Sequence, residues 1–353
     1  MPTCSTMRDS LPETPSPPKP MVLVFAADAR YFYGLAVALA GVLHNSSGLD
    51  HACIHIVDGG LSPRQRNRFR RIVSRSPARG IMLNYHVIDA ARFTGMRRMY
   101  RSAHCYARLL LPELLPDCDE VLYLDADICC GADIHEIWRT DISKAAAAAV
   151  RDTSVMDLRN DCSWPFSTAE GDDERYFNSG VMKINLAYWR QHDISIRALS
   201  LAIAEPEKCT FWDQTVLNFL LHGAIRWLPG GYNIQDCHER PTEVDAAEFR
   251  YQNLHHVSIR KPWLQHSSRT TFRHWRSCYA AQVSRFPGYM YKVGYWLPYL
   301  GTEWLKGTVF HLPLIHVLLA TKLYRVIPYL TEAIMQEYLH AALQRPKQTF
   351  RRG

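Results

Sequence analysis

Two aspartates at the end of an apolar run constrain this chain more than any other feature of its sequence. The run 121–124 predicts a buried strand, and Asp125 and Asp127 follow it at a polar edge. Because side chains alternate faces along a strand, we expect the two carboxylates to point the same way. Neighbouring carboxylates repel each other, and a hard divalent cation shared with substrate phosphates relieves that repulsion. The pair therefore predicts a metal site that binds a diphosphate.

The composition is that of a globular protein with one large or two medium domains. Of the 353 residues, 47% are hydrophobic and 21% are charged, which is enough to bury a sizeable core. The ten cysteines include no Cys-x-x-Cys pair. This argues against a zinc site or a disulfide framework and favours a reducing compartment. The formal net charge of +7 favours an anionic partner, which could be a nucleotide, a lipid surface or nucleic acid.

Strand-like and helix-like stretches alternate along the chain, which predicts an α/β fold with a largely parallel sheet. We expect strands at 21–28, 53–58, 81–88 and 121–124, and a turn followed by a strand at 177–185. We expect helices at 33–43, after Ser62-Pro63, and at 106–115, 186–201 and 215–221. The secondary structure of the stretch 144–150 is left undecided, because its five consecutive alanines favour a helix while its length favours a buried strand.

An arginine-rich stretch from Arg64 to Arg79 raises the question of nucleic-acid binding. We interpret it as the solvated face of a helix, because Phe69 is the one aromatic residue interleaved for base stacking. We therefore expect no nucleic-acid partner.

The two ends of the chain differ from its middle. Residues 1–20 hold six prolines and predict a disordered tail without the apolar core of a secretory signal, which favours a cytoplasmic protein. Residues 276–353 predict a basic, aromatic and helical C-terminal region whose longest apolar run, 309–320, is too short to span a bilayer. This composition favours peripheral contact with a membrane interface. A helical cap packed on the main domain is the alternative.

Six short motifs occur in a fixed order. They are Phe25-Ala26-Ala27-Asp28, Tyr106-Ala107-Arg108-Leu109, Leu122-Tyr123-Leu124-Asp125-Ala126-Asp127, Phe177-Asn178-Ser179-Gly180-Val181, Asp213-Gln214, and His255 with Lys261-Pro262-Trp263. Together they resemble glycosyltransferase family 8, and most of all the bacterial lipopolysaccharide galactosyl- and glucosyltransferases. The resemblance covers about 21–275 and implies a GT-A nucleotide-diphospho-sugar transferase fold, a Rossmann-like mixed sheet flanked by helices.

The resemblance also implies a role for each matched position. Asp125, Asp127 and His255 would hold Mn²⁺, with Mg²⁺ as the alternative, on the diphosphate of a UDP-sugar. Lys261 would add a second positive charge on that diphosphate, and Ala26 with Asp28 would hold uracil and ribose. Four further residues would bind the donor sugar or line its pocket: Arg108, Asp152, Asn178 and Asp213.

The implied reaction is hexosyl transfer with retention of anomeric configuration. Glucose or galactose would pass from UDP-glucose or UDP-galactose to a glycan or glycolipid acceptor, such as a lipopolysaccharide core, at the inner face of the cytoplasmic membrane. Gln214 would lie beneath the anomeric carbon. An amide is a poor nucleophile, so a front-face internal return is favoured, and Asp213 or Asp152 remains a nucleophile candidate for double displacement.

Two departures from the family pattern affect the donor site. Arg30 stands where a ribose contact is expected, so the nucleoside grip is expected to differ. Ser258 replaces the usual glycine between His255 and Lys261, where a glycine lets the backbone approach phosphate.

Other interpretations remain open at this stage. Singly, Asp28 could cap a helix, Asn178 could be a turn residue, Arg108 could pair with Glu113, and His255 could be a core histidine. A haloacid-dehalogenase-type phosphatase also places Asp-x-Asp after an apolar strand. That motif normally lies on the first strand and is followed by Thr or Val where this chain has Cys129. The alternative that is not an enzyme is a catalytically inactive relative that binds UDP-sugar or glycan.

Overall fold

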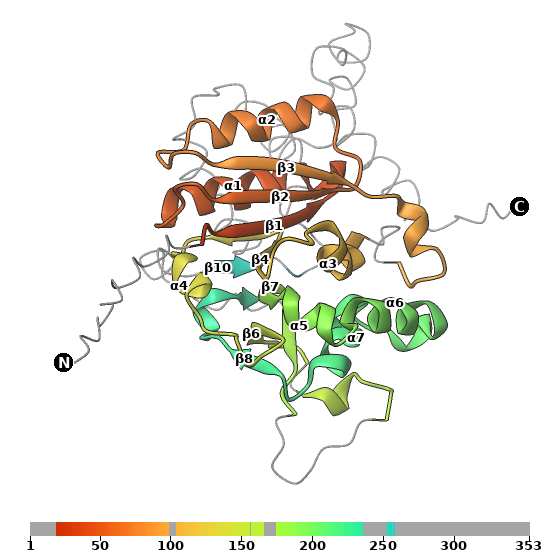
Figure 1. Cartoon of the computed structure of the whole chain (residues 1–353). Coiled ribbons are helices and arrows are strands. Elements are labelled where there is room, and N and C mark those ends of the chain that lie inside the picture. The colour runs from red at the N-terminus through yellow and green to blue at the C-terminus, as the bar shows by residue number, and fades with distance from the viewer. Residues whose placement is uncertain are drawn as a thin grey trace, which may run out of the picture.

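A computed structural model describes residues 19–98, 104–155, 157–165, 174–235, 253–255 and 257. Within these residues a seven-stranded sheet has the order β3-β2-β1-β4-β7-β6-β8, and a three-stranded sheet has the order β5-β10-β9 (Figure 1). The large sheet contains β1 (Val22–Ala27), β2 (Cys53–Asp58), β3 (Met82–Val87), β4 (Glu120–Asp125), β6 (Ala147–Arg151), β7 (Phe177–Asn185) and β8 (Ile225–Trp227). The small sheet contains β5 (Ile128–Cys130), β9 (Ile234–Gln235) and β10 (Asn253–His255).

Helices surround the large sheet. The α-helices are α1 (Phe32–Asn45), α2 (Pro63–Val73), α3 (Leu111–Leu114), α4 (His135–Trp138), α5 (Leu186–Gln191), α6 (Ile194–Ala204) and α7 (Asp213–Leu221). The 3₁₀ helices are η1 (Ala29–Tyr31), η2 (Ala90–Phe93), η3 (His104–Leu110), η4 (Leu158–Asn160), η5 (Pro206–Lys208) and η6 (Gly230–Tyr232). In the described part of the chain, none of them is long and apolar enough to cross a membrane.

The large sheet is largely parallel, as predicted, and is mixed because β7 runs against the other strands. β1 pairs in parallel with β2 and β4, and β2 pairs in parallel with β3. β7 then runs antiparallel to both β4 and β6. The stretch 144–150, for which the sequence allowed either a helix or a strand, contains the buried strand β6. Its small alanine side chains fit where the sheet is covered on both faces.

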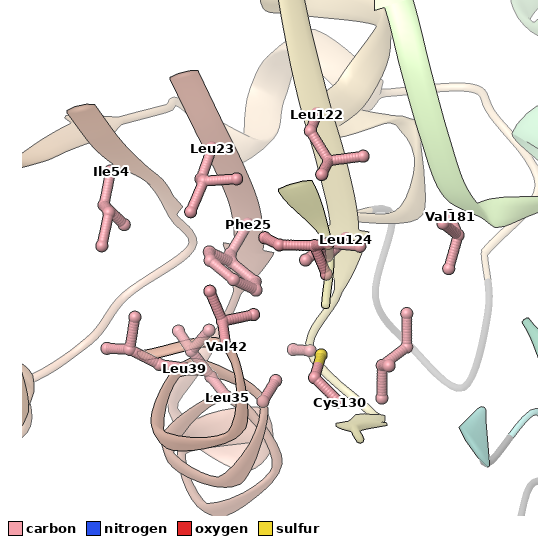
Figure 2. Close-up of a cluster of buried hydrophobic side chains, with 14 of the residues drawn as sticks. Leu23, Phe25, Leu35, Leu39, Val42, Ile54, Leu122, Leu124, Cys130 and Val181 are labelled. Carbon is pink, nitrogen blue, oxygen red and sulfur yellow. The ribbon is translucent and has the colours of Figure 1, made fainter. Parts of the chain in front are cut away.

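The strand β1 lies inside the sheet, between β2 and β4, and is buried on both faces. Leu23 and Phe25 belong to the cluster beneath α1, whereas Val24 packs in the cluster on the opposite face. This explains why the strand reads as a continuous apolar run rather than an alternating one. Figure 2 shows the first cluster, with Leu23, Phe25, Leu122 and Leu124 of the sheet facing Leu35, Leu39 and Val42 of α1. Burying each such side chain contributes roughly 1.5–3 kcal/mol.

The opposite face is covered by η3, α3, α5, α6 and α7, and here two helix predictions need correction. The stretch 106–115 is mainly the 3₁₀ helix η3, with only one short α-helical turn at its end. The stretch 186–201 forms two helices, because Asp193 takes the left-handed conformation at φ 52° and interrupts the helix between α5 and α6.

The arginine-rich helix α2 begins as its sequence predicts. The Ser62 hydroxyl accepts the Gln65 N–H and the Gln65 side chain accepts the Ser62 N–H, which completes a capping box. Phe69 is the buried anchor of the helix, and Arg66 forms a 2.6 Å ion pair with the buried Asp58. The exposed arginines fit a solvated face.

The fold brings the end of β4 beside the start of β7. Leu124 pairs with Val181, so the residues after β4 lie next to the first residues of β7. The carboxyl end of β1 lies beside them, because Ala26 pairs with Asp125. Ligands of open α/β sheets bind outside the carboxyl ends of the strands where the strand order reverses.

Residues 1–18 of the predicted N-terminal tail 1–20, and the whole of the predicted C-terminal region 276–353, lie outside the described residues. The domain boundaries at 21 and 275 therefore stay predictions.

Candidate active site

Three predicted ligand residues converge at the end of β4. Asp125, Asp127 and His255 each offer one ligand atom, and these atoms all lie within 4.8 Å of one another. His255 Nε2 is 3.2 Å from Asp127 Oδ1 and 3.7 Å from Asp125 Oδ2. The three residues come from parts of the chain about 130 positions apart and form one candidate metal centre.

One detail of the prediction is wrong. The strand β4 ends at Asp125, and Ala126 and Asp127 form a turn, so strand alternation does not orient Asp127. The chain leaves the large sheet here and enters the small one at Ile128. In the small sheet, β10 runs antiparallel to β5 and pairs His255 with Ile128. That register, rather than strand alternation, places the histidine beside the turn.

The space behind these ligands is kept by Gly180 of β7. A Cβ at this position would lie 2.1 Å from His255 Cε1 and 2.9 Å from Asp125 Oδ2. Real Cβ atoms do not approach that closely, so a larger residue would displace the ligands. Two carboxylates and one imidazole suit a divalent cation of the manganese type, since Mg²⁺ is more exclusively an oxygen binder. The residues present thus fit the predicted cation.

Arg108 of η3 connects the candidate metal centre to the rest of the site. Its guanidinium lies 2.9 Å from Asp125 Oδ1 and 2.9 Å from Asp213 Oδ2, and it donates to the Ser179 carbonyl. It also stacks over the ring of Tyr123, with Cζ 4.3 Å from the ring centroid. Burial disfavours the charged guanidinium, but the two carboxylates outweigh it and raise the Arg108 pKa. The alternative pairing with Glu113 is wrong, because Glu113 binds Arg92.

A second group of polar residues lies beside β7. Asp152 Oδ2 accepts from Asn178 Nδ2 at 3.0 Å and from Gln214 Nε2 at 3.1 Å. Gln214 Oε1 in turn accepts the Ser179 N–H at 2.9 Å. Asn178 is therefore a strand residue in a buried polar network rather than an ordinary turn residue. The structure brings together the residues predicted to line a sugar pocket.

Asp213 is the most perturbed carboxyl of this group. Its pKa is raised to about 6, because burial and the nearby charge of Asp125 raise it by more than Arg108 lowers it. Asp213 begins helix α7 and is 3% exposed. A buried carboxyl that titrates this close to neutrality is a hallmark of functional sites.

The residues predicted to hold the nucleoside lie at the end of β1. Ala26 is the penultimate residue of the strand, and Asp28 comes directly after the strand with 8% of its surface exposed. Asp28 Oδ1 accepts the N–H groups of Arg30 and Tyr31, so this residue does cap η1. Its Oδ2 binds the Arg30 guanidinium at 2.7 Å. Arg30 therefore engages the very carboxylate predicted to contact ribose. Lys261 and Ser258 lie outside the described residues.

Sequence reasoning missed three residues of the site. Tyr123 donates to Asp125 Oδ1 at 2.9 Å, and Asn233 lies 3.0 Å from His255 Nδ1. Burial raises the Tyr31 pKa, and the charges of Asp127 and Asp125 raise it further, which places that phenol close to the acidic pair. Tyr123 and Tyr31 lie within or next to quoted motifs and could have been found there. Asn233 carries no local signal, because only the tertiary fold brings it to His255.

This fold and site define a GT-A glycosyltransferase. The profile described as "Glycosyl transferase family 8" matches residues 22–267. The chain belongs to glycosyl transferase family 8, and its enzyme class is that of the hexosyltransferases.

Several known proteins are similar to this chain. The lipopolysaccharide 1,2-glucosyltransferase of Escherichia coli K12 is 25% identical over 255 residues, which cover 68% of this chain and 72% of that protein. The lipopolysaccharide 1,3-galactosyltransferase of Salmonella typhimurium is 24% identical, with 68% and 72% covered. Across the first three curated relatives, the match spans 65%, 72% and 93% of their lengths.

The fold is also similar to that of a solved enzyme. The crystal structure of the galactosyltransferase LgtC with donor and acceptor sugar analogs has a TM-score of 0.60 and 25% sequence identity. The similarity covers 76% of this chain and 97% of that chain.

Proposed function

We propose that this chain transfers glucose or galactose from a UDP-sugar to a glycan or lipid-linked oligosaccharide, such as a lipopolysaccharide core, with retention and with Mn²⁺. The observation that carries the proposal is the convergence of Asp125, Asp127 and His255 around Gly180, beside a buried polar pocket. The named activities of the similar enzymes support the choice of hexose and of acceptor.

Each part of the donor has a proposed binding group. Asp125, Asp127 and His255 hold the cation, which when bound neutralises the diphosphate leaving group. Lys261 adds a positive charge to that group. Ala26 and Asp28 hold the nucleoside, and the Arg30 ion pair sets the orientation of the Asp28 carboxylate.

The pocket beside β7 holds the hexose. Arg108, Asp152, Asn178, Asp213 and Gln214 are its proposed lining. Their buried donors and acceptors discriminate sugars by the hydroxyls that they satisfy, because a buried polar group left without a partner is costly.

The hydrogen bonds of Asp152 favour a front-face mechanism. Its Oδ1 accepts two backbone N–H groups, from Ser154 and Val155, and its Oδ2 accepts the amides of Asn178 and Gln214. A carboxylate with four donors is a weak nucleophile. Asp213 is likewise held by Arg108. In the front-face route the bond from C1 to the phosphate oxygen breaks, the acceptor oxygen bonds to C1 on the same face, and the departing phosphate takes the acceptor proton.

The test is UDP release from a panel of UDP-sugars, with Mn²⁺ and with EDTA. We expect Mn²⁺-dependent turnover of UDP-glucose or UDP-galactose, which Asp127→Asn reduces at least 100-fold, whereas Asp141→Asn at an exposed position leaves it unchanged. Full turnover in EDTA would contradict the metal assignment. UDP-sugar binding without turnover, even with added acceptor glycans, would favour the inactive binding relative.

A second part of the proposal concerns residues 276–353. We propose that this basic and aromatic region holds the enzyme at the inner face of the cytoplasmic membrane. Removal of 287–353 is expected to abolish co-sedimentation with anionic vesicles while leaving UDP-sugar hydrolysis in place. A truncated protein that unfolds would instead identify the region as a structural cap.

A further inference from the structure

We propose that Asn233 is a positioning residue that sets the tautomer of His255, so that the ring presents its Nε2 lone pair to the acidic pair. The inference rests on the proposed function, since it takes His255 to be a metal ligand. Asn233 follows η6, is 1% exposed and lies on the side of the imidazole away from Asp127. Its orientation follows from a chain of hydrogen bonds that begins at Asp152.

The first link is the Asp152 carboxylate, which can only accept hydrogen bonds. Asn178 and Gln214 contact the same oxygen, Oδ2, at 3.0 Å and 3.1 Å. Both amides must therefore turn their NH₂ groups toward Asp152. The Ser179 N–H independently requires this orientation of Gln214, because it donates to Gln214 Oε1 at 2.9 Å.

The second link is the Asn178 carbonyl oxygen, which points away from Asp152. It accepts the Gly180 N–H at 3.0 Å, and a backbone N–H can only donate. The orientation of Asn178 is thus fixed at both ends. The same oxygen lies 2.9 Å from Asn233 Nδ2, so Asn233 donates its NH₂ group here.

The third link joins Asn233 to His255. With its NH₂ group turned to Asn178, Asn233 presents Oδ1 to His255 Nδ1 at 3.0 Å. A carbonyl oxygen only accepts, so Nδ1 carries a proton. A neutral imidazole has one N–H, which leaves a lone pair on Nε2. That lone pair faces Asp127 Oδ1 at 3.2 Å, an arrangement that becomes favourable when a cation lies between them.

Two consequences follow from this chain. The ligand atom of His255 is preset before a cation arrives, and hydrogen bonds that fix a ligating histidine in this way are typically worth 10- to 100-fold in metal affinity. The metal centre and the sugar pocket also share one chain of amides, so Asn233 connects His255 to Asp152 and Gln214.

The first test measures Mn²⁺ binding to the full-length protein by electron paramagnetic resonance of free Mn²⁺, without donor sugar. Asn233→Leu, which removes the acceptor, is expected to weaken binding about 10- to 100-fold. Asn233→Asp keeps an acceptor for Nδ1 but loses the donor to Asn178, so it is expected to retain more Mn²⁺ affinity than Asn233→Leu. Asn218→Leu is the matched control, because Asn218 is equally buried at 1% exposed but bonds to Phe177 and Gln214 rather than to His255.

The second test reads the tautomer directly from the ring ¹⁵N shifts of His255 in metal-free protein at about pH 8. We expect Nδ1–H in wild type and in Asn218→Leu, and a shift toward Nε2–H in Asn233→Leu. The inference is overturned by Nε2–H in wild type, by wild-type Mn²⁺ affinity in Asn233→Leu, or by an equal loss in Asn218→Leu. Wild-type protein that binds no Mn²⁺ would overturn the proposed function instead, and the ring shifts would still decide the role of Asn233.

Discussion

The guanidinium of Arg108 lies 2.9 Å from Asp125, a proposed metal ligand, and reaches Asp213 in the proposed sugar pocket with its Nε. One buried guanidinium therefore holds two carboxylates that come from different elements, the end of β4 and the start of α7. Arg108 is 3% exposed, and Asp213 is equally buried. The stability of the fold therefore depends on Arg108, which is also a proposed residue of the site.

The first prediction concerns removal of this charge. Arg108→Met leaves two acidic groups without their partner, one of them fully buried, and is expected to lower the free energy of unfolding by about 3–5 kcal/mol. Urea unfolding of the metal-free protein measures it. Arg92→Met removes one partner of the exposed Arg92–Glu113 pair and should cost less than about 1 kcal/mol. Equal losses of unfolding free energy in the two variants would show that the Arg108 ion pairs stabilise the fold no more than an exposed pair does.

The second prediction concerns the glycine behind the ligands. Gly180→Ala places a methyl group 2.1 Å from His255 Cε1, so the imidazole must move. We expect Mn²⁺ affinity to fall about tenfold or more, measured by titration of the metal-free protein. Gly230→Ala is the control, because its Cβ would meet no atom within 4 Å. Unchanged affinity in Gly180→Ala would mean that this close approach does not shape the centre.

The third prediction concerns pH. His55 Nδ1 lies 2.8 Å from His86 Nε2 between β2 and β3. Burial, together with the nearby His86, lowers the pKa of His55 to about 4, and burial also lowers the pKa of His86. The unfolded chain then binds more protons between about pH 4 and pH 6.5. The stabilisation is complete above about pH 6.5 and is lost as pH falls toward 4.

Chemical unfolding at pH 7 and pH 5 measures this effect. Since both rings are partly solvated, we expect the pair to contribute about 1 kcal/mol of the pH dependence. His55→Gln should reduce the dependence on pH, and His192→Gln, at an exposed position, should leave it in place. An unaltered pH slope in His55→Gln would rule out the pair as its source.

The fourth prediction concerns the start of α2. Ser62→Ala removes the hydroxyl that accepts the Gln65 N–H and should lower the free energy of unfolding by about 1 kcal/mol. Ser74→Ala, at the other end of the helix, removes only a bond to the Arg71 carbonyl and should cost a few tenths of that. Thermal or urea unfolding compares the two, and the reverse order would contradict the capping assignment.

The fold class and much of the site could be predicted because their signals are local. The apolar run of β1 reflects burial on both faces of the sheet, and the Ser62 cap reflects a bond to a residue three positions away. The ordered motifs likewise pointed to Asp125, Asp127 and His255, whose ligand atoms the fold brings within 4.8 Å of one another.

The tertiary structure decided the features that depend on long-range geometry. The chain leaves the large sheet after Asp125, so a turn rather than strand alternation places Asp127. Asn233 meets His255 only because β9 and β10 pair in the small sheet. Arg108 chooses Asp125 and Asp213 over Glu113 because burial makes an unpaired charge costly, whereas the pairing at an exposed helix surface is weak. Sequence alone therefore determined the family, the fold class and the candidate residues that lie in motifs, because these signals are local. Packing and burial determined how those residues contact one another and added Asn233, which carries no local signal.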